Sequence, residues 1–211
     1  MKWVQKCSEP QIFTDWKALA SEAWQPSYAN LGGAEKQAVK QALMQEQGGL
    51  CCYCERRLSE ADSHIEHFRP QSDLGVDALE FANMLCSCQN QLRQGEPRHC
   101  GNAKGDWFDE AVLVSPLESD CESRFSYLGN GCIKPSVSND NFASETIHHL
   151  ALDIPKLRAL RAAVITPFLD EYLTDEELKR FAEGYLQQQN DGLYGEFWSV
   201  IKYLFLDCVG E

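Results

Sequence analysis

Residues 51–70 read CCYCERRLSEADSHIEHFRP, and the interpretation of the whole chain depends on this stretch. Cys51 and Cys54 stand at C-x-x-C spacing, and Glu66 directly precedes His67. Zinc binds thiolates in a tetrahedral arrangement, and two cysteines three positions apart can bind it from one turn of the chain. We therefore predict that Cys51 and Cys54 supply half of a zinc site.

The second half of this zinc site has to come from cysteines further along the chain. Cys88 and Cys100 are the preferred pair, with Cys86 as an alternative to Cys88. Six of the 10 cysteines fall between positions 51 and 100, and the N-terminal residues do not form a signal peptide. Both observations favour metal binding in a reducing compartment over a disulfide framework. We expect a cytoplasmic protein, because no apolar stretch is long enough to span a membrane.

The net charge of −13 argues at first against a protein that handles nucleic acid. Of the 32 acidic residues, however, 19 follow position 105, so the excess lies away from the cysteine and Glu-His motifs. Net charge steers association and does not decide the chemistry of a local site. The acidic C-terminal half instead suits contact with a basic protein partner.

The Glu66-His67 pair has a specific chemical use. A carboxylate oxygen suits a hard cation such as Mg²⁺ or Mn²⁺, and a neutral imidazole with a pKa of about 6.5 can take a proton from water. Neighbouring side chains on a strand point to opposite faces, so the chain has to turn after this pair, as Pro70 indicates. Taken alone, a Glu-His pair is common, and a structural role for His64 or His67 is then the simpler explanation.

Several motifs in combination resemble an HNH endonuclease module with zinc-binding cysteine pairs, over about residues 50–106. They are Cys51-x-x-Cys54, Glu66-His67-x-x-Pro70, Asn83 five residues before Cys88, and Cys100-Gly-Asn-Ala-Lys104-Gly105. More narrowly, the runs HIEHFRP and HCGNAKGDWFD resemble the PtuB-type HNH proteins. Those proteins belong to bacterial antiphage systems of the Septu kind and to some retron operons, where they stand beside an ATPase, PtuA.

The resemblance implies a role for each catalytic residue. Glu66 is expected to bind the catalytic Mg²⁺ or Mn²⁺, and His67 to act as the general base. Asn83 is expected to orient the His67 ring through a hydrogen bond. Asn102 is expected to be the second metal ligand, with His99 as the alternative.

The resemblance also implies a zinc site and substrate contacts. Structural zinc is expected on Cys51, Cys54, Cys88 and Cys100. Lys104 or Arg69 is expected to hold a phosphate, although solvated surface charge explains these two residues equally well. Two features depart from the family pattern, because an insertion separates Cys88 from Cys100 and Gly101 follows Cys100 where the metal-binding residue usually stands.

The predicted fold class is α+β and mainly helical, with a ββα-metal, treble-clef-like, zinc-stapled module embedded in a helical scaffold. We expect three parts, which are a helical segment at 1–49 for docking a partner, the HNH module at 50–110, and a mostly helical region at 111–211. Helices are predicted at 34–47, within 145–172 with breaks at 153–155 and near 167, at 178–186 and at 192–207. A strand pair is predicted around 129–131.

The function that follows is hydrolysis of phosphodiester bonds in nucleic acid, with DNA and RNA both open. The expected partners are a PtuA-type ATPase, the nucleic acid substrate, and a retron reverse transcriptase with its nucleic acid, and no membrane is involved. One alternative is a zinc-stabilised module that binds nucleic acid or protein without cutting. Another is a redox or metal-handling protein, in which thiols rather than Glu66 or His67 carry the activity.

Overall fold

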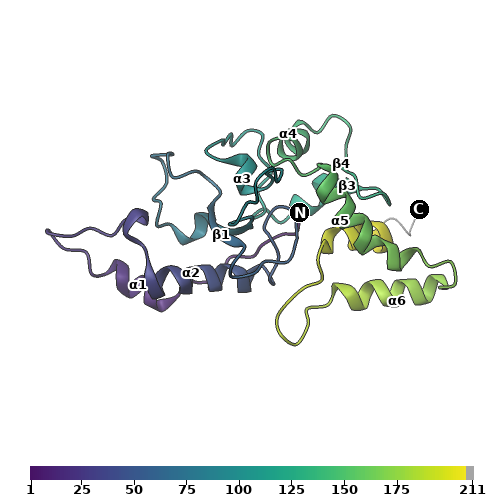
Figure 1. Cartoon of the computed structure of the whole chain (residues 1–211), viewed down its shortest axis with the longest axis horizontal. Helices are drawn as coiled ribbons and strands as arrows, with labels where there is room; N and C mark the ends of the chain where they lie inside the picture. Colours follow the sequence, from purple (N-terminus) through teal and green to yellow (C-terminus); the bar gives the residue numbers. More distant parts are fainter. Residues whose placement is uncertain (208–211) are drawn as a thin grey trace.

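The computed structural model describes residues 1–207, and this part of the chain is α+β, mostly helical, with two small antiparallel sheets. Its helices and strands are α1 (Gln11–Lys17), α2 (Gly33–Glu46), β1 (Ser63–His67), β2 (Met84–Cys88), α3 (Gly101–Lys104), β3 (Phe125–Tyr127), β4 (Ile133–Pro135), α4 (Asn141–His149), α5 (Pro155–Ile165), α6 (Asp175–Leu186) and α7 (Trp198–Lys202). Figure 1 shows α1 and α2 at one end of the molecule and α6 at the other, with the β1 and α3 region above α2. In the described residues, no helix combines the length and apolar character needed to cross a membrane.

The predicted helix at 34–47 is confirmed as α2, which buries Val39 and Leu43. Its end is fixed by Gln47, whose buried side chain donates to the Cys86 carbonyl (2.9 Å) and accepts from the Cys86 amide (2.7 Å). Gly48 follows with a φ of 58°, and a Cβ there would lie 2.1 Å from the Tyr194 ring. The C-terminal segment therefore packs directly on the turn that leads into the first cysteines.

The strands β1 and β2 pair in an antiparallel hairpin, in which Ser63 lies opposite Cys88 and Glu66 opposite Leu85. Side chains alternate between the two faces of a strand, so His64 and Glu66 share one face of β1. The short helix α3 starts at Gly101, directly after Cys100. Two strands followed by a helix, with cysteines at the end of β2 and the start of α3, match the expected ββα arrangement.

The elements beyond position 110 largely follow the sequence expectations. The strand pair around 129–131 is confirmed as β3 and β4. The break predicted at 153–155 separates α4 from α5, which has a proline at its first position. Thr174 and Glu177 form a capping box at the start of α6, where each side chain accepts a hydrogen bond from the backbone amide of the other.

The helix predicted at 192–207 is wrong over its first six residues, 192–197. Phe197 has a φ of 52°, in the left-handed region, and α7 begins only at Trp198. A Cβ on Gly195 would lie 2.4 Å from the Tyr185 ring, so this stretch packs closely against α6. Tertiary packing therefore overrides the helical spacing of its aromatic residues.

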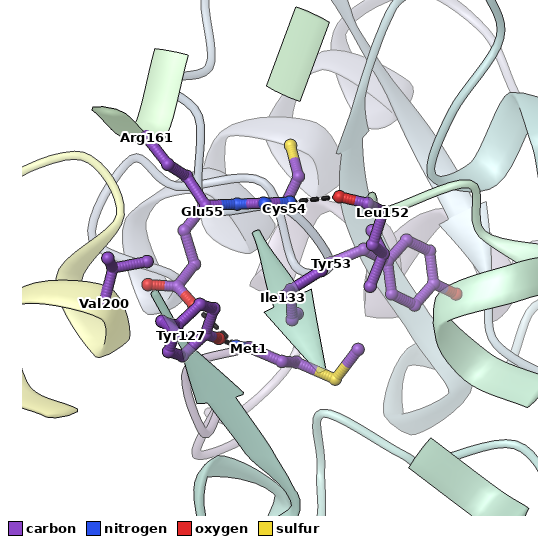
Figure 2. A pocket seen from close by; sticks show the side chains of 9 residues that line it. All are labelled: Met1, Tyr53, Cys54, Glu55, Tyr127, Ile133, Leu152, Arg161 and Val200. Atoms are coloured by element: carbon purple, nitrogen blue, oxygen red, sulfur yellow. Dashed lines mark hydrogen bonds and ion pairs between the residues drawn. The ribbon is translucent and has the colours of Figure 1, made fainter. Parts of the chain in front are cut away.

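A buried ion pair connects the first cysteine turn to both the N-terminus and the C-terminal helix. Glu55, next to Cys54, lies 2.7 Å from the Met1 ammonium and accepts hydrogen bonds from the Ser199 amide and hydroxyl. Figure 2 shows Glu55 and Met1 facing each other beside Tyr127. The cysteine turn is thus part of one core with residues far away in the sequence.

Candidate functional site

Four cysteine sulfurs gather at the base of the hairpin. Cys51 and Cys54 come from the turn after α2, Cys88 ends β2, and Cys100 caps α3. All four residues are buried, and their sulfurs lie within 4.8 Å of one another. Zinc–sulfur bonds of about 2.3 Å in a tetrahedron put the sulfurs roughly 3.8 Å apart. The 3.7 Å between the Cys54 and Cys88 sulfurs fits this, so the cluster can hold a zinc ion.

The other buried cysteines nearby do not belong to this cluster. Burial raises the pKa of the Cys86 thiol to about 12, and burial also raises the pKa of Cys52 well above its usual value. Both are therefore protonated core side chains at neutral pH. The Cys51 sulfur, in contrast, accepts a hydrogen bond from the Cys88 amide at 3.5 Å. Of the two candidates for the third sulfur, the structure selects Cys88 over Cys86.

His99 lies against the four-cysteine cluster. Its Nδ1 is 3.1 Å from the Cys100 sulfur and 3.8 Å from the Cys88 sulfur. Burial lowers the pKa of this imidazole to about 4, so it is neutral. Its Nε2 is buried and has no hydrogen-bond partner among the described residues. The structure thus places His99 against the cysteines, and the expectation that it replaces Asn102 at the catalytic metal is not met.

Glu66 lies in a separate depression, which none of the four cysteines lines. Its Oε1 accepts hydrogen bonds from Tyr53 (3.1 Å) and from Lys104 (2.9 Å). Its Oε2 lies 3.6 Å from His64 Nε2. Burial by itself raises the pKa of Glu66, but His64 and Lys104 together hold it below its usual value. A buried carboxylate that stays ionised is suited to binding a cation.

The depression brings together several of the residues predicted from the sequence. Its lining consists of Ile65, Glu66, His67, Pro70, Gln71, Ser72, Gly101, Lys104, Gly105 and Asp106. Glu66 and His67 come from β1, and Lys104 comes from α3. A carboxylate, an imidazole and an ammonium group thus line the same hollow.

The His67 ring is oriented by a backbone carbonyl. Nε2 lies 2.9 Å from the Ala78 oxygen, and Nδ1 lies 3.4 Å from the Gln71 side-chain nitrogen. A carbonyl can only accept, so Nε2 carries the proton and Nδ1 carries the lone pair. Burial lowers the pKa of this imidazole below its usual value, which keeps it in the neutral form that a general base needs.

The predicted hydrogen bond from Asn83 to the His67 ring is wrong. The Asn83 oxygen accepts from the Arg69 amide (2.8 Å), and its nitrogen donates to the Arg69 carbonyl (2.9 Å). Asn83 precedes β2, whereas Arg69 follows β1. The side chain therefore fixes the path of the chain after the Glu66-His67 pair, and its oxygen and its nitrogen each bond to the Arg69 backbone.

Asn102 does not reach Glu66 either. Its side-chain nitrogen donates to the Gln89 carbonyl at 2.6 Å, and it does not line the depression. The residues of α3 that face the carboxylate are Lys104, at Oε1, and Gly101, where a Cβ would lie 2.2 Å from Oε2. The helix starts at Gly101, so the next residue points in another direction.

The two predicted phosphate contacts differ in their surroundings. Lys104 is buried, and besides Glu66 its Nζ donates to the His67 carbonyl at 3.0 Å. Arg69 pairs with Asp73 at 2.9 Å and keeps 34% of its side chain exposed. His64, to which the sequence motifs assign no role in the site, lies 3.6 Å from Glu66 Oε2, although it does not line the depression. The alternation of side chains along β1, which puts His64 on the face of Glu66, was the signal that could have found it.

No protein-family model matches the chain. It is 29% identical over 133 residues to a protein of Vibrio cholerae serotype O1 biovar El Tor named "Retron Vc95 putative HNH endonuclease". The aligned part covers 60% of this chain and 62% of that protein, which is less than two thirds of either. This similarity supports a nuclease function, and it agrees with the HNH resemblance of the motifs around the depression.

Proposed function

We propose that this protein is a metal-dependent HNH-type endonuclease that hydrolyses phosphodiester bonds of nucleic acid. The observation that carries the proposal is the depression in which Glu66, His67 and Lys104 meet, in the same ββα unit as a buried four-cysteine cluster. The similarity to a protein named as an HNH endonuclease supports the same reaction. A module that only binds nucleic acid has no need for a buried neutral imidazole beside an ionised carboxylate.

In this proposal His67 is the general base. Its Nδ1 carries the lone pair, because Nε2 donates to the Ala78 carbonyl. Nδ1 takes a proton from water, the water oxygen bonds to phosphorus, and the bond from phosphorus to the leaving oxygen breaks. The leaving oxygen takes its proton from solvent. Arg69, with its partly exposed guanidinium, is the remaining candidate for a phosphate contact.

Glu66 would hold the catalytic cation, Mg²⁺ or Mn²⁺, which when bound stabilises negative charge on the phosphate and the leaving oxygen. Cys51, Cys54, Cys88 and Cys100 would hold a structural zinc that ties the hairpin to α3. Lys104 and Tyr53 hold the Glu66 carboxylate in place, since both donate to its Oε1. These residues hold the metal ions or orient the groups that bind them, whereas His67 transfers the proton.

The biological setting is also a proposal. It rests on the PtuB-type resemblance and on the retron in the relative's name. In it, residues 50–110 are the nuclease module of an antiphage effector of the Septu or retron kind, and residues 1–49 and 111–211 dock a PtuA-type ATPase. A reverse transcriptase with its nucleic acid is a further partner, and the protein acts in the cytoplasm.

The test compares wild type with His67→Ala, alone and with the candidate ATPase, on DNA and on RNA, with and without Mg²⁺ or Mn²⁺. We expect metal-dependent cutting that disappears in His67→Ala while the variant keeps its zinc. His148→Ala, which changes an exposed histidine of α4, is the matched control and should cut like wild type. Binding without cutting by a folded, zinc-loaded protein in every combination would favour the non-catalytic module instead.

A further inference from the structure

The two oxygens of the Glu66 carboxylate have different surroundings. Oε1 already accepts two hydrogen bonds, from Tyr53 and from Lys104. Oε2 faces His64 Nε2 at 3.6 Å, which is beyond hydrogen-bond distance. The two donors on Oε1 therefore fix the carboxylate in the orientation that turns Oε2 toward His64.

The distance between these two atoms fits two ligands of one cation. Metal–nitrogen and metal–oxygen bonds of about 2.0–2.2 Å place two ligand atoms roughly 3.0–3.6 Å apart at the angles found in octahedral and tetrahedral sites. His64 and Glu66 are two residues apart on β1, so both side chains leave the same face of the strand. Both side chains can therefore bind the same ion without any change in the pairing of β1.

Gly101 allows these two atoms to lie close to the start of α3. A Cβ there would lie 2.2 Å from Glu66 Oε2 and 3.0 Å from His64 Nε2. The backbone does not explain the glycine, because Gly101 is not among the glycines with positive φ. The close approach of the carboxylate and the imidazole is thus the reason that this position has no side chain.

We propose that His64 and Glu66 are the two protein ligands of a divalent transition-metal ion such as Mn²⁺, and that the absence of a side chain at Gly101 lets both groups take the positions needed to bind it. The role of this ion in catalysis rests on the proposed nuclease function, whereas the geometry of the site does not. Imidazole nitrogen favours transition metals, whereas Mg²⁺ favours an all-oxygen shell. The site should therefore bind Mn²⁺ more tightly than Mg²⁺.

The experiment measures Mn²⁺ binding to the zinc-loaded protein from the loss of the free Mn²⁺ signal in electron paramagnetic resonance. We expect one bound Mn²⁺ per wild-type chain, displaced only by a large excess of Mg²⁺. His64→Ala should weaken binding at least tenfold. Gly101→Ala tests the same site without removing a ligand, and its methyl group should also weaken binding. His148→Ala is the control and should bind like wild type.

Wild-type affinity in His64→Ala, or no Mn²⁺ binding by the wild type, would overturn the inference. A loss of binding in Asn102→Ala with none in His64→Ala would return the ligand role to Asn102. Cutting assays on the same samples separate the two proposals. If His64→Ala loses Mn²⁺ but the wild type cuts neither DNA nor RNA, the metal site stands and the nuclease function fails. If His64→Ala binds Mn²⁺ and cuts like the wild type, the nuclease function stands and the role of His64 as a metal ligand fails.

Discussion

The Lys104 ammonium lies 2.9 Å from Glu66 Oε1, and both side chains are almost completely buried. The sequence motifs predict a phosphate contact or a solvated charge at Lys104, whereas in the structure Lys104 is the internal counter-ion of the proposed metal ligand. Losing one partner of a buried pair leaves a charge without compensation, which costs far more than the pair itself contributes. The site is therefore sensitive to a residue that need not touch substrate.

Replacing Lys104 should lower both the stability of the protein and its activity. Lys104→Met leaves the Glu66 carboxylate without its ammonium partner, and we expect a loss of about 3–5 kcal/mol in the free energy of unfolding. Urea unfolding followed by circular dichroism measures this. Lys179→Met, at an exposed position of α6, is the matched control and should change stability by less than about 0.5 kcal/mol. Unchanged stability together with a higher KM for nucleic acid would instead identify Lys104 as a phosphate contact.

The two cysteines near the end of β2 should differ sharply in their effect on zinc. Cys88 belongs to the four-sulfur cluster, whereas Cys86 is a protonated core thiol two residues away. Cys88→Ser should lose the bound zinc and much of the fold around the hairpin, since a structural metal supplies local folding energy. Cys86→Ser should keep one zinc per chain. Metal analysis of the purified variants decides this, and the opposite pattern would show that the third ligand is Cys86.

Asn83 should act through the backbone of Arg69 rather than through the His67 ring. Asn83→Ala removes both hydrogen bonds to that backbone and should cost about 1–3 kcal/mol of stability, measured by urea unfolding. Activity should fall as well, because the chain after β1 shifts. Asn90→Ala, an exposed asparagine in the loop after β2, should change neither quantity. Full stability with a large loss of kcat would instead support a direct role at the His67 ring.

The sequence could predict those parts of the site that depend on local spacing. The C-x-x-C turn, the capping box at Thr174 and the strand that carries Glu66 and His67 are local patterns, and the structure contains each of them. The partners of Asn83, Asn102 and His99 could not be predicted in this way. They are set by contacts across the fold, such as the Arg69 backbone and the Gln89 carbonyl, and by the insertion between Cys88 and Cys100.

The residues after position 190 show the same limit. Their aromatic spacing suggests one helix, but Gly195 packs on Tyr185 and Glu196 accepts from the Arg57 amide at 2.7 Å. A left-handed Phe197 then delays the helix. The buried Met1–Glu55 pair also joins three segments that no local pattern connects. Residues distant in sequence therefore decide where the C-terminal helix begins.

The buried Met1 ammonium should make the protein less stable at alkaline pH. Burial by itself lowers the pKa of this group, but the Glu55 carboxylate and Tyr127 raise it from 8.0 to about 11. A raised pKa contributes stability that is fully present below the unfolded value of 8.0 and is lost as the pH rises through 11. This rise in the pKa corresponds to a contribution on the order of 4 kcal/mol to the free energy of unfolding.

Urea unfolding at pH 7, 9 and 10.5 should therefore show a fall in stability that begins above pH 8. The control is the chain with an acetylated Met1 nitrogen, which has no charge to lose. It should be less stable than the free form at pH 7, because Glu55 then lacks its buried partner, and its stability should change less between pH 8 and 10.5. Tyr127→Phe removes an acceptor 2.8 Å from the ammonium and should shift the fall to lower pH. Equal pH profiles for the free and acetylated chains would mean that the ammonium is not held by Glu55 in solution.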